Sequence, residues 1–240
     1  MRKVKHDTAI VIPTYNEREN VLAICEAVLA QMDARIWIVD DDSPDGTGDL
    51  ADELASKDSR VRVLHRRGRP RGLGPAYRDG FVQALSEDVD FVMQMDADFS
   101  HDPVMVPVLR QAAEDADLVL GSRYVEGGGT QDWSLLRRFI SQGGSTYARL
   151  ILGMPIKDVT GGFKCWRASA LRDLHPERVA STGFAFQIEM NHLALKSGMR
   201  VVEHPILFAD RLRGDSKMSF GIFLEGLLAV WRIRYRHGRR

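Results

Sequence analysis

Short apolar segments alternate with helical patterns through the first half of the sequence, and this alternation constrains the fold more than any other feature. Five segments have the length and composition of buried strands: residues 8–13, 35–39, 61–64, 90–95 and 117–123. Helical patterns and short connections lie between them. This order is typical of α/β proteins with a mostly parallel central sheet and helices on both faces. We therefore predict a Rossmann-like, doubly wound sheet.

The second half of the sequence is less regular. Residues 133–152 predict an amphipathic helix, with Gly127–Gly129 as a flexible entry to it. Residues 158–163 predict a turn into a short strand. The apolar segment 201–208 is interrupted by a proline, which cannot donate a ladder hydrogen bond. We therefore expect this last strand at an edge of the sheet.

Composition limits the class of protein. At 240 residues with 44% hydrophobic residues, the chain suits one α/β domain or a domain with a small appendage. Its zero formal net charge gives no indication of nucleic-acid binding. The two distant cysteines, Cys25 and Cys165, suit a reducing cytosol. The charged segment Met1–Asp7 does not resemble a signal peptide, and no apolar run is long enough to span a bilayer.

Two acids follow the segment 90–95, where an open α/β sheet normally exposes its ligand crevice. Asp96 and Asp98, at i and i+2, can face one divalent cation and a diphosphate together. Their oxygen atoms suit Mg²⁺ or Mn²⁺. Asp102 and Pro103 predict the cap and first residue of the next helix. Taken alone, an Asp-x-Asp pair is more often a solvated loop with two incidental acids.

Several common motifs are absent. The first strand-to-helix turn lacks G-x-G-x-x-G, and the chain contains neither a G-x-x-x-x-G-K-[ST] loop nor a G-x-S-x-G elbow. Instead, acids occur at two strand ends, and arginines and a lysine occur in later loops. This combination suits a nucleotide diphosphate that is held by a metal and by cations. The acids at the strand ends are Asp40, Asp41, Asp96 and Asp98.

Several motifs, taken in order, resemble family-2 glycosyltransferases. They are I-P-T-Y-N-E-R-E-N (Ile12–Asn20), V-D-D-D-S-P-D-G-T (Val39–Thr47) and G-L-G-P-A-Y (Gly72–Tyr77). Others narrow the resemblance to dolichol-/polyprenol-phosphate mannose synthases: Met95–Pro103, Gly121–Gly128, Asp158–Lys164, Phe186–Glu189 and Asp210–Met218. The similarity covers residues 8–218. It implies a GT-A fold, a divalent metal and inverting transfer of mannose from GDP-mannose to a polyprenyl (dolichyl-type) phosphate.

The resemblance also implies roles for individual residues. The donor site would comprise Pro13, Tyr15, Glu17, Val39, Asp41, Asp96, Ala97, Asp98, Arg123, Arg211 and Lys217. Asp96 and Asp98 would hold the metal, and Arg137 and Ser141 would meet the acceptor phosphate. Arg211 and Lys217 would clamp phosphates as a late loop closes. The expected catalytic residues are Asp98, Arg123, Arg211 and Lys217.

The acceptor implied by the resemblance needs little chemical activation. A phosphate monoester is already an oxyanion at neutral pH, because its second pKa is about 6. Positioning by arginines therefore matters more than deprotonation by a carboxylate. The sequence fits this, since no isolated His or Asp stands out as a required base.

The C-terminal residues 219–240 form a second predicted unit after a catalytic domain of residues 1–218. Residues 219–231 have apolar side chains at helical spacing, and five arginines occur in the final nine residues. The helix either packs on the core or lies at a membrane interface with its arginines on anionic lipid. The basic tail and the lipid acceptor favour the second interpretation. We expect a cytoplasmic protein that is peripheral on the membrane, with a membrane-embedded partner subunit as one possibility.

Other interpretations stay open. One alternative is a polyprenol-phosphate glycosyltransferase whose donor sugar is glucose or another hexose instead of mannose. A second alternative, which is not an enzyme, is a catalytically silent subunit that binds lipid phosphate. A sugar nucleotidyltransferase has a glycine-rich N-terminal loop, which is missing here. Structural roles are expected for Gln187, Glu189, His101, His192 and His204, and Arg137 alone would suit a solvated helix face.

Overall fold

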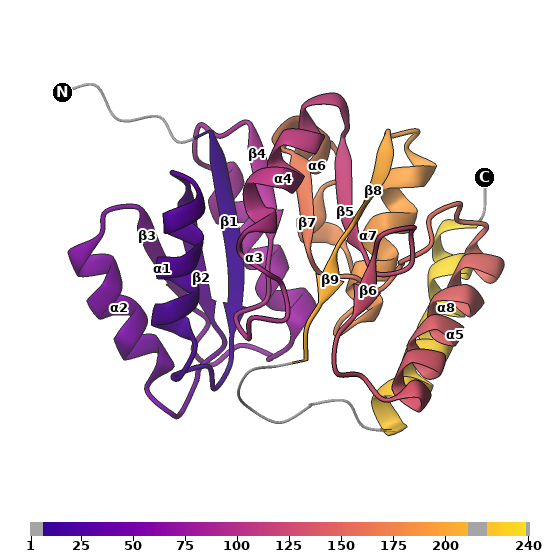
Figure 1. Cartoon of the computed structure of the whole chain (residues 1–240), viewed down its shortest axis with the longest axis horizontal. Coiled ribbons are helices and arrows are strands. Elements are labelled where there is room, and N and C mark those ends of the chain that lie inside the picture. Colours follow the sequence, from indigo (N-terminus) through magenta and orange to yellow (C-terminus); the bar gives the residue numbers. More distant parts are fainter. Residues whose placement is uncertain (1–6, 211–219, 239–240) are drawn as a thin grey trace.

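The computed structural model describes residues 7–210 and 220–238, and its centre is a seven-stranded sheet (Figure 1). The strands lie in the order β3-β2-β1-β4-β7-β5-β8. Their bounds are β1 Thr8–Thr14, β2 Arg35–Asp40, β3 Val61–His65, β4 Phe91–Gln94, β5 Leu118–Ser122, β7 Lys164–Arg167 and β8 Val201–Pro205. The mostly parallel sheet that the sequence predicts is confirmed, and β8 is the expected edge strand.

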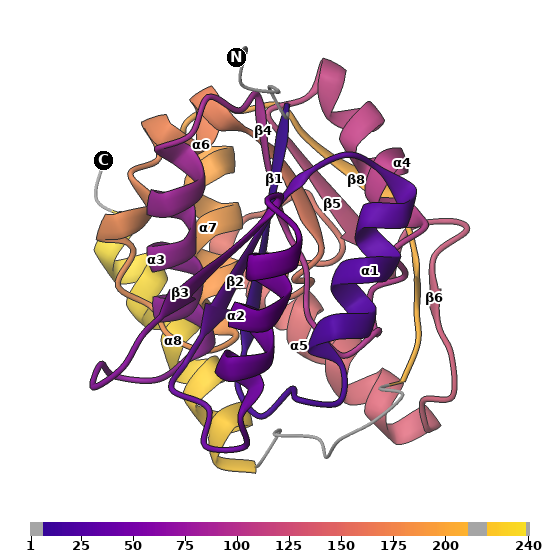
Figure 2. The same ribbon diagram turned by 90° about the vertical axis from the view of Figure 1, so that its left-hand side faces the viewer.

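Helices cover both faces of this sheet, as the two views show (Figures 1 and 2). They are α1 Val21–Gln31, α2 Thr47–Lys57, α3 Leu73–Leu85, α4 Met105–Ala112, α5 Leu135–Leu152, α6 Ala168–Asp173, α7 Ala185–Lys196 and α8 Phe220–His237. Two 3-10 turns, Ala113–Asp115 and Pro176–Arg178, complete the set. Because side chains alternate along a strand, β1 sends Val11 to one core and Ile12 to the other. The first core includes residues of α3, α6 and α7, and the second includes residues of α1, α2 and α4.

The direction of β7 is a feature that the strand–helix alternation did not predict. β7 lies between β4 and β5 and pairs antiparallel with both. Parallel pairs join β1 to β2 and β4, β2 to β3, and β5 to β8. The carboxyl ends of β1, β2 and β4 therefore meet at one edge of the sheet, next to the amino end of β7. Loops from both halves of the chain converge at that edge.

Two local predictions are wrong. The helix after β4 begins at Met105 rather than at Pro103, although Asp102 does cap the turn before it, since Asp102 Oδ1 accepts from Val104 N at 3.0 Å. Gly127–Gly129 is not only a flexible entry, since Gly129–Thr130 forms strand β6 and pairs with β9, Leu207–Phe208. A Cβ at Gly128 would lie 2.5 Å from the Ser122 carbonyl oxygen, so this close approach requires glycine.

The C-terminal helix α8 runs beside α5 and contacts α7 (Figure 1). Val230 and Ile233 are buried, and Trp231 Nε1 donates to Tyr147 Oη at 2.9 Å. The other face of α8 exposes Leu228 and Tyr235. No helix within residues 7–210 or 220–238 has the length and apolar character that crossing a bilayer requires.

Candidate active site

A cavity of about 380 Å³ lies at the edge where β1, β2 and β4 end. Its walls come from these strand ends, from the start of α3 and from the loop before α7. They comprise Pro13, Thr14, Tyr15, Glu17, Asp41, Arg71, Gly72, Leu73, Ala76, Asp96, Ala97, Asp98, Gly183 and Phe184. The fold thus brings together most of the described residues that the resemblance assigns to the donor, and it does so at the edge where open α/β sheets bind ligands.

Val39 and Arg123 do not line this cavity. The Val39 side chain is fully buried in the core, where a Cβ on Gly80 would lie 2.9 Å from its Cγ2 atom. Arg123 lies beyond the cavity wall in a buried ion pair. Arg211 and Lys217 lie outside the described residues. The donor and catalytic roles of these four residues remain predictions.

The turns that follow β1, β2 and β4 each contain a non-glycine residue with positive φ. These are Asn16 at 56°, Asp42 at 61° and Phe99 at 61°. Asn and Asp tolerate the left-handed region, whereas Phe adopts it at a cost. Behind Phe99, the Asp98 carboxylate accepts hydrogen bonds from Ser100 N at 3.1 Å and Ser100 Oγ at 2.6 Å. These bonds hold the turn in this unusual conformation and so hold Asp98 at the cavity wall.

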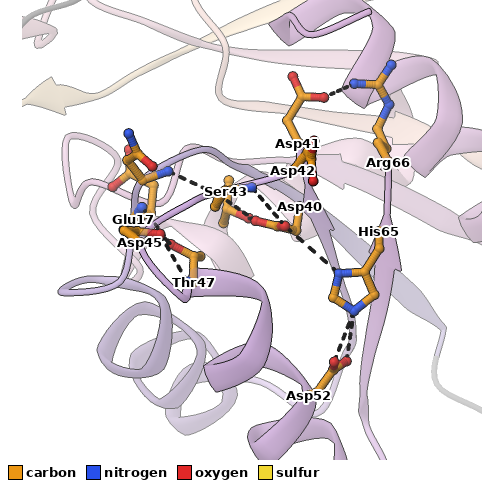
Figure 3. Close-up of polar contacts among 12 residues, drawn as sticks. Glu17, Asp40, Asp41, Asp42, Ser43, Asp45, Thr47, Asp52, His65 and Arg66 are labelled. Carbon is orange, nitrogen blue, oxygen red and sulfur yellow. Dashed lines mark hydrogen bonds and ion pairs between the residues drawn. The ribbon is translucent and has the colours of Figure 1, made fainter. Parts of the chain in front are cut away.

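The acid-rich loop after β2 divides into two networks (Figure 3). Asp40 accepts from Ser43 Oγ at 2.6 Å and from Thr14 Oγ1 at 3.3 Å, so it braces the turns beneath the cavity. Asp41 points instead toward Arg66, which donates to its Oδ1 atom, and Gly72 N donates to Oδ2 at 2.6 Å. Asp41 therefore ties the arginine-rich loop to the end of β2.

Arg71 is a cation of the cavity wall to which the sequence analysis gave no role. Its guanidinium lies 4.8 Å from the Tyr15 ring centroid and donates to Tyr15 Oη at 3.0 Å and to the Asp42 carbonyl at 3.0 Å. The cluster of four arginines between residues 66 and 71 was the available signal. Only the fold shows that Arg66 is buried while Arg71 reaches the cavity.

Asp96 is surrounded by aromatic residues that sequence reasoning did not assign to the site. Tyr77 Oη donates to Asp96 Oδ1 at 3.3 Å, and burial together with the Asp96 charge raises the pKa of Tyr77 well above its ordinary value. His101 Nδ1 accepts from Asp96 N at 3.0 Å, so a neutral ring carries its proton on Nε2. Burial lowers the pKa of His101, which favours that neutral form. Phe163 stacks on the imidazole with ring centroids 4.8 Å apart.

The carboxylates of Asp96 and Asp98 suit a shared cation better than an all-protein metal cage. In residues 7–210 and 220–238, no cluster of three or more His, Cys, Asp or Glu side chains forms a complete binding site. Mg²⁺ is commonly held by one or two carboxylates, with substrate phosphates and water completing its coordination. Mn²⁺ has similar ligand preferences. The pair at the cavity wall fits such a cation.

Arg123 forms a buried salt bridge with Asp158 behind the site. Arg123 Nε donates to Asp158 Oδ2 at 2.7 Å and Nη2 donates to Oδ1 at 2.7 Å, while Nη2 also donates to Thr160 Oγ1 at 2.8 Å. Burial opposes the charge on Asp158, but the charge and hydrogen bonds of Arg123 outweigh it and lower the pKa of the carboxyl. The pair connects the end of β5 to the loop before β7.

Arg137 and Ser141 lie one turn apart on α5. Arg137 Nη1 bonds both Asp210 carboxylate oxygens at 2.9 Å, and its guanidinium lies 4.1 Å from the Trp133 ring centroid. Tyr124 Oη donates to Ser141 Oγ at 2.7 Å. Arg137 is therefore partnered rather than simply solvated. Because Arg137 is paired with Asp210, it does not bind an acceptor phosphate in this structure. The acceptor role of Arg137 and Ser141 stays a prediction.

A buried polar network lies behind Asp96. Lys164 Nζ donates to Gln187 Oε1 at 2.6 Å, and Gln94 Nε2 donates to the same oxygen at 3.2 Å. These two donors orient the Gln187 amide. Burial lowers the pKa of Lys164 to about 7, although the Asp158 charge acts in the opposite direction. The predicted bracing role of Gln187 is consistent with these contacts, and Lys164 is its unpredicted partner.

Replacing Lys164 with methionine should change how stability depends on pH. Between about pH 7 and about pH 10, unfolded chains bind a proton at this lysine that the folded protein lacks, so wild-type stability rises with pH. Relative to Lys164→Met, we expect a rise of about 1.4 kcal/mol per pH unit in the free energy of unfolding. Urea unfolding across this pH interval measures the difference. Lys57→Met removes an exposed lysine as the control, and parallel profiles for Lys164→Met and wild type would contradict the assignment.

Comparison with known proteins agrees with the geometry. A family model described as Glycosyl transferase family 2 matches residues 9–174. An undecaprenyl-phosphate mannosyltransferase of Micrococcus luteus is 44% identical over 223 residues, covering 92% of this chain and 91% of the relative. A polyprenol monophosphomannose synthase of Mycolicibacterium smegmatis is 44% identical over 237 residues, covering 97% of this chain and 89% of the relative.

Solved structures share the architecture at much lower identity. A glucosyl-3-phosphoglycerate synthase from Mycobacterium tuberculosis, in complex with Mn²⁺, UDP and glucosyl-3-phosphoglycerate, has a TM-score of 0.66 at 17% identity and covers 98% of this chain and 81% of its own. A mannosyltransferase from Pyrobaculum calidifontis, in complex with GDP-Man and Mn²⁺, has a TM-score of 0.60 at 15% identity, covering 98% and 66%. These likenesses concern the GT-A fold. The family model and the two relatives show that this chain is a glycosyltransferase and belongs to glycosyl transferase family 2.

Proposed function

We propose that the protein transfers mannose from GDP-mannose to a polyprenyl phosphate, with inversion at the sugar carbon. The observation that carries the proposal is the cavity with Asp96 and Asp98 at its wall, in a chain 44% identical to two polyprenol-phosphate mannosyltransferases. The guanosine would occupy the part lined by Pro13, Tyr15 and Glu17, with Arg71 over the tyrosine ring. The donor diphosphate would then lie near Asp96, Ala97 and Asp98.

A divalent cation, Mg²⁺ or Mn²⁺, would be held by Asp96 and Asp98 and would stabilise the charge that develops on the departing diphosphate. Tyr77 and His101 orient Asp96 through its carboxylate and its backbone N–H. Arg71 adds positive charge at the cavity wall, and Arg211 and Lys217 are proposed to clamp the phosphates. Charges placed in this way lower the barrier most when they act on the leaving group rather than on the bound ground state.

The acceptor phosphate would meet Arg137 and Ser141 on α5. Arg137 would release the Asp210 carboxylate and bind the acceptor phosphate instead, so that one anionic partner replaces another. The acceptor oxygen carries negative charge at neutral pH and attacks without a protein base. The exposure of α5 would leave the polyprenyl chain free to remain in lipid.

An assay of purified protein with radiolabelled GDP-mannose, Mg²⁺ or Mn²⁺ and polyprenyl phosphate tests the proposal. We expect label in the organic phase, no label there without the divalent cation, and little competition from UDP-glucose. Equal transfer from UDP-glucose would favour the hexosyl alternative. Donor binding without any turnover would favour the silent lipid-phosphate subunit.

The surface shared by α5 and α8 is proposed to contact the membrane. Several of its apolar side chains are exposed: Leu135, Leu136, Phe139, Ile140, Leu150, Leu228, Trp231 and Tyr235. All of them belong to α5 or α8, which lie side by side, and exposed apolar side chains gathered on adjacent helices often mark contact sites. The arginines near the C-terminal end of α8, Arg232, Arg234 and Arg236, would add attraction to anionic lipid. The protein would thus be peripheral on the cytoplasmic face, alone or with a membrane-embedded partner subunit.

Replacing Leu135, Phe139 and Leu150 together by serine should weaken membrane binding without unfolding the protein. These side chains are 82%, 77% and 79% exposed, so the core loses almost nothing. Because each would bury apolar area in lipid, we expect at least about a tenfold drop in the fraction that floats with liposomes. The control replaces three exposed apolar residues away from this surface, Leu22, Val82 and Val104. Equal flotation of the two variants would contradict the assignment of the surface.

A further inference from the structure

A second and larger cavity, of about 740 Å³, lies between the C-terminal ends of α5, α7 and α8. None of its lining residues takes part in the candidate active site. It is lined by Leu152, Gly153, Met154, Pro155, His192, Leu195, Lys196, Trp231, Arg234, Tyr235, His237 and Gly238. Its walls are thus of two kinds: apolar and aromatic side chains, and four basic ones.

The four basic side chains of this cavity belong to two helices, and on each helix they are one turn apart. His192 and Lys196 are one turn apart on α7, and Arg234 and His237 are one turn apart on α8, so each pair projects from one helix face. The His192 and His237 rings lie with centroids 6.2 Å apart. Among the residues that the structure describes, no Asp or Glu lines the cavity. Glu189, on the buried side of α7, is engaged by Arg236 at 2.7 Å, His237 at 2.8 Å and Ser181 N at 2.9 Å.

The positive charges converge on His192. Burial lowers the pKa of this half-buried imidazole, and the charges of His237, Lys196 and Arg234 lower it further, while the charge of Glu189 acts in the opposite direction. Cations at helix ends also interact favourably with the helix dipoles. That interaction accounts for single basic residues at helix ends, but not for an open cavity whose wall combines four basic side chains with apolar ones.

The apolar wall indicates what kind of anion fits. Leu152, Met154 and Leu195 form its inner part, and Trp231 and Tyr235 stand exposed at the side that continues into the proposed membrane surface. Trp and Tyr are the residues that commonly occupy membrane–water interfaces. A small inorganic anion would leave most of the cavity unused. A phosphate with a lipid body would contact both kinds of wall.

The cavity is distinct from the proposed acceptor site. Arg137 and Leu152 are separated by fifteen residues of α5, which is about 22 Å of helix. One phosphate cannot occupy both places. A lipid bound at the second cavity is therefore a different molecule from the polyprenyl phosphate acceptor.

We propose that this second cavity binds the phosphodiester headgroup of an anionic membrane lipid, with His192, Lys196, Arg234 and His237 around the phosphate and Trp231 and Tyr235 beside the acyl chains. The proposal rests on the membrane association proposed above and does not depend on the identity of the donor sugar. A lipid bound here would fix the orientation of α5 on the bilayer and thereby present the acceptor end of the helix.

The test measures binding of the full chain to phosphatidylglycerol–phosphatidylcholine vesicles and to phosphatidylcholine vesicles. Lys196→Gln with Arg234→Gln should reduce binding to the anionic vesicles by at least about tenfold, because both cations line the cavity and are proposed to contact the bound phosphate directly. The matched control, Lys57→Gln with Arg178→Gln, removes equal charge from exposed positions outside the cavity and away from α5 and α8. Its binding should fall by less than about threefold. Equal losses in the two double variants would show attraction by diffuse charge and overturn the proposal.

A second arm follows the His192 imidazole by NMR. Phosphatidylglycerol in small bicelles should raise the pKa of His192, since a bound anion offsets its cationic neighbours. If inorganic phosphate raises it equally at the same concentration, the cavity is a free-anion site and the lipid proposal fails. Transfer of mannose to a short, soluble acceptor in detergent should be unchanged in Lys196→Gln with Arg234→Gln. A wild-type protein that binds anionic lipid through the cavity yet transfers no mannose would refute the proposed function and leave this site intact.

Discussion

The Asp98→Asn variant should transfer mannose about 1,000-fold more slowly than the wild-type protein. Asp98 is only 4% exposed and lines the cavity, and its Oδ1 atom accepts hydrogen bonds from Ser100 N and Ser100 Oγ. Asparagine keeps the shape and one acceptor oxygen but loses the negative charge. Removing one well-placed electrostatic group from an active site typically costs a factor of about 100 to 1,000, and loss of the metal would add to this. Turnover of radiolabelled GDP-mannose at saturating divalent cation measures the effect.

The matched control for this variant is Asp102→Asn. Asp102 lies four residues further along and is exposed, and its side chain accepts a hydrogen bond only from Val104 N among the described contacts. We expect its activity to stay within about threefold of wild type, because rim charges contribute little. Thermal unfolding should show that Asp98→Asn is folded. If Asp98→Asn retained near-normal turnover and metal-dependent donor binding, Asp98 would not be a metal ligand.

The Asp158→Asn variant should lose about 3 kcal/mol of unfolding free energy, since breaking a buried ion pair leaves the remaining charge without compensation. Asp158 accepts three hydrogen bonds from Arg123, including one from the Arg123 backbone at 3.0 Å, and it is fully buried. The asparagine amide would place N–H groups against the guanidinium. Guanidinium chloride unfolding at neutral pH measures the loss.

An exposed pair provides the comparison for Asp158→Asn. Glu114→Gln breaks the Arg110–Glu114 salt bridge of 3.3 Å, in which the Glu114 side chain is 64% exposed. We expect a change below about 0.5 kcal/mol there. A similarly small change for Asp158→Asn would mean that the Arg123–Asp158 pair does not stabilise the junction between β5 and the loop before β7. Arg123 would then be available for the donor role that the sequence resemblance predicts.

The sequence determined the layered α/β fold and the edge at which the active site forms. Buried strands and amphipathic helices depend on local periodicity, which any segment of the chain displays by itself. The segments around 8–13, 35–39 and 90–95 are strands of the sheet, and the residues that follow them line the cavity. Asp41, Asp96 and Asp98 could be found because strand ends and carboxylates are both visible in a linear sequence.

The tertiary structure alone decided which polar groups meet. Lys164 and Gln187 are 23 residues apart, and Arg123 and Asp158 are 35 apart, so no local pattern joins them. The antiparallel position of β7 is also absent from any local pattern. It depends on which of several similar apolar segments pair with one another, and these segments are far apart in the sequence.

Burial also cannot be read from residue type. Arg66 and Arg71 belong to one short basic loop, yet the first is buried against Asp41 and the second lines the cavity. The C-terminal helix shows the same limit: its apolar pattern does not say that one face packs on α5 while the other stays exposed. Local propensity specifies elements, whereas the free energy of burying a charge or an apolar face depends on neighbours that only the folded chain supplies.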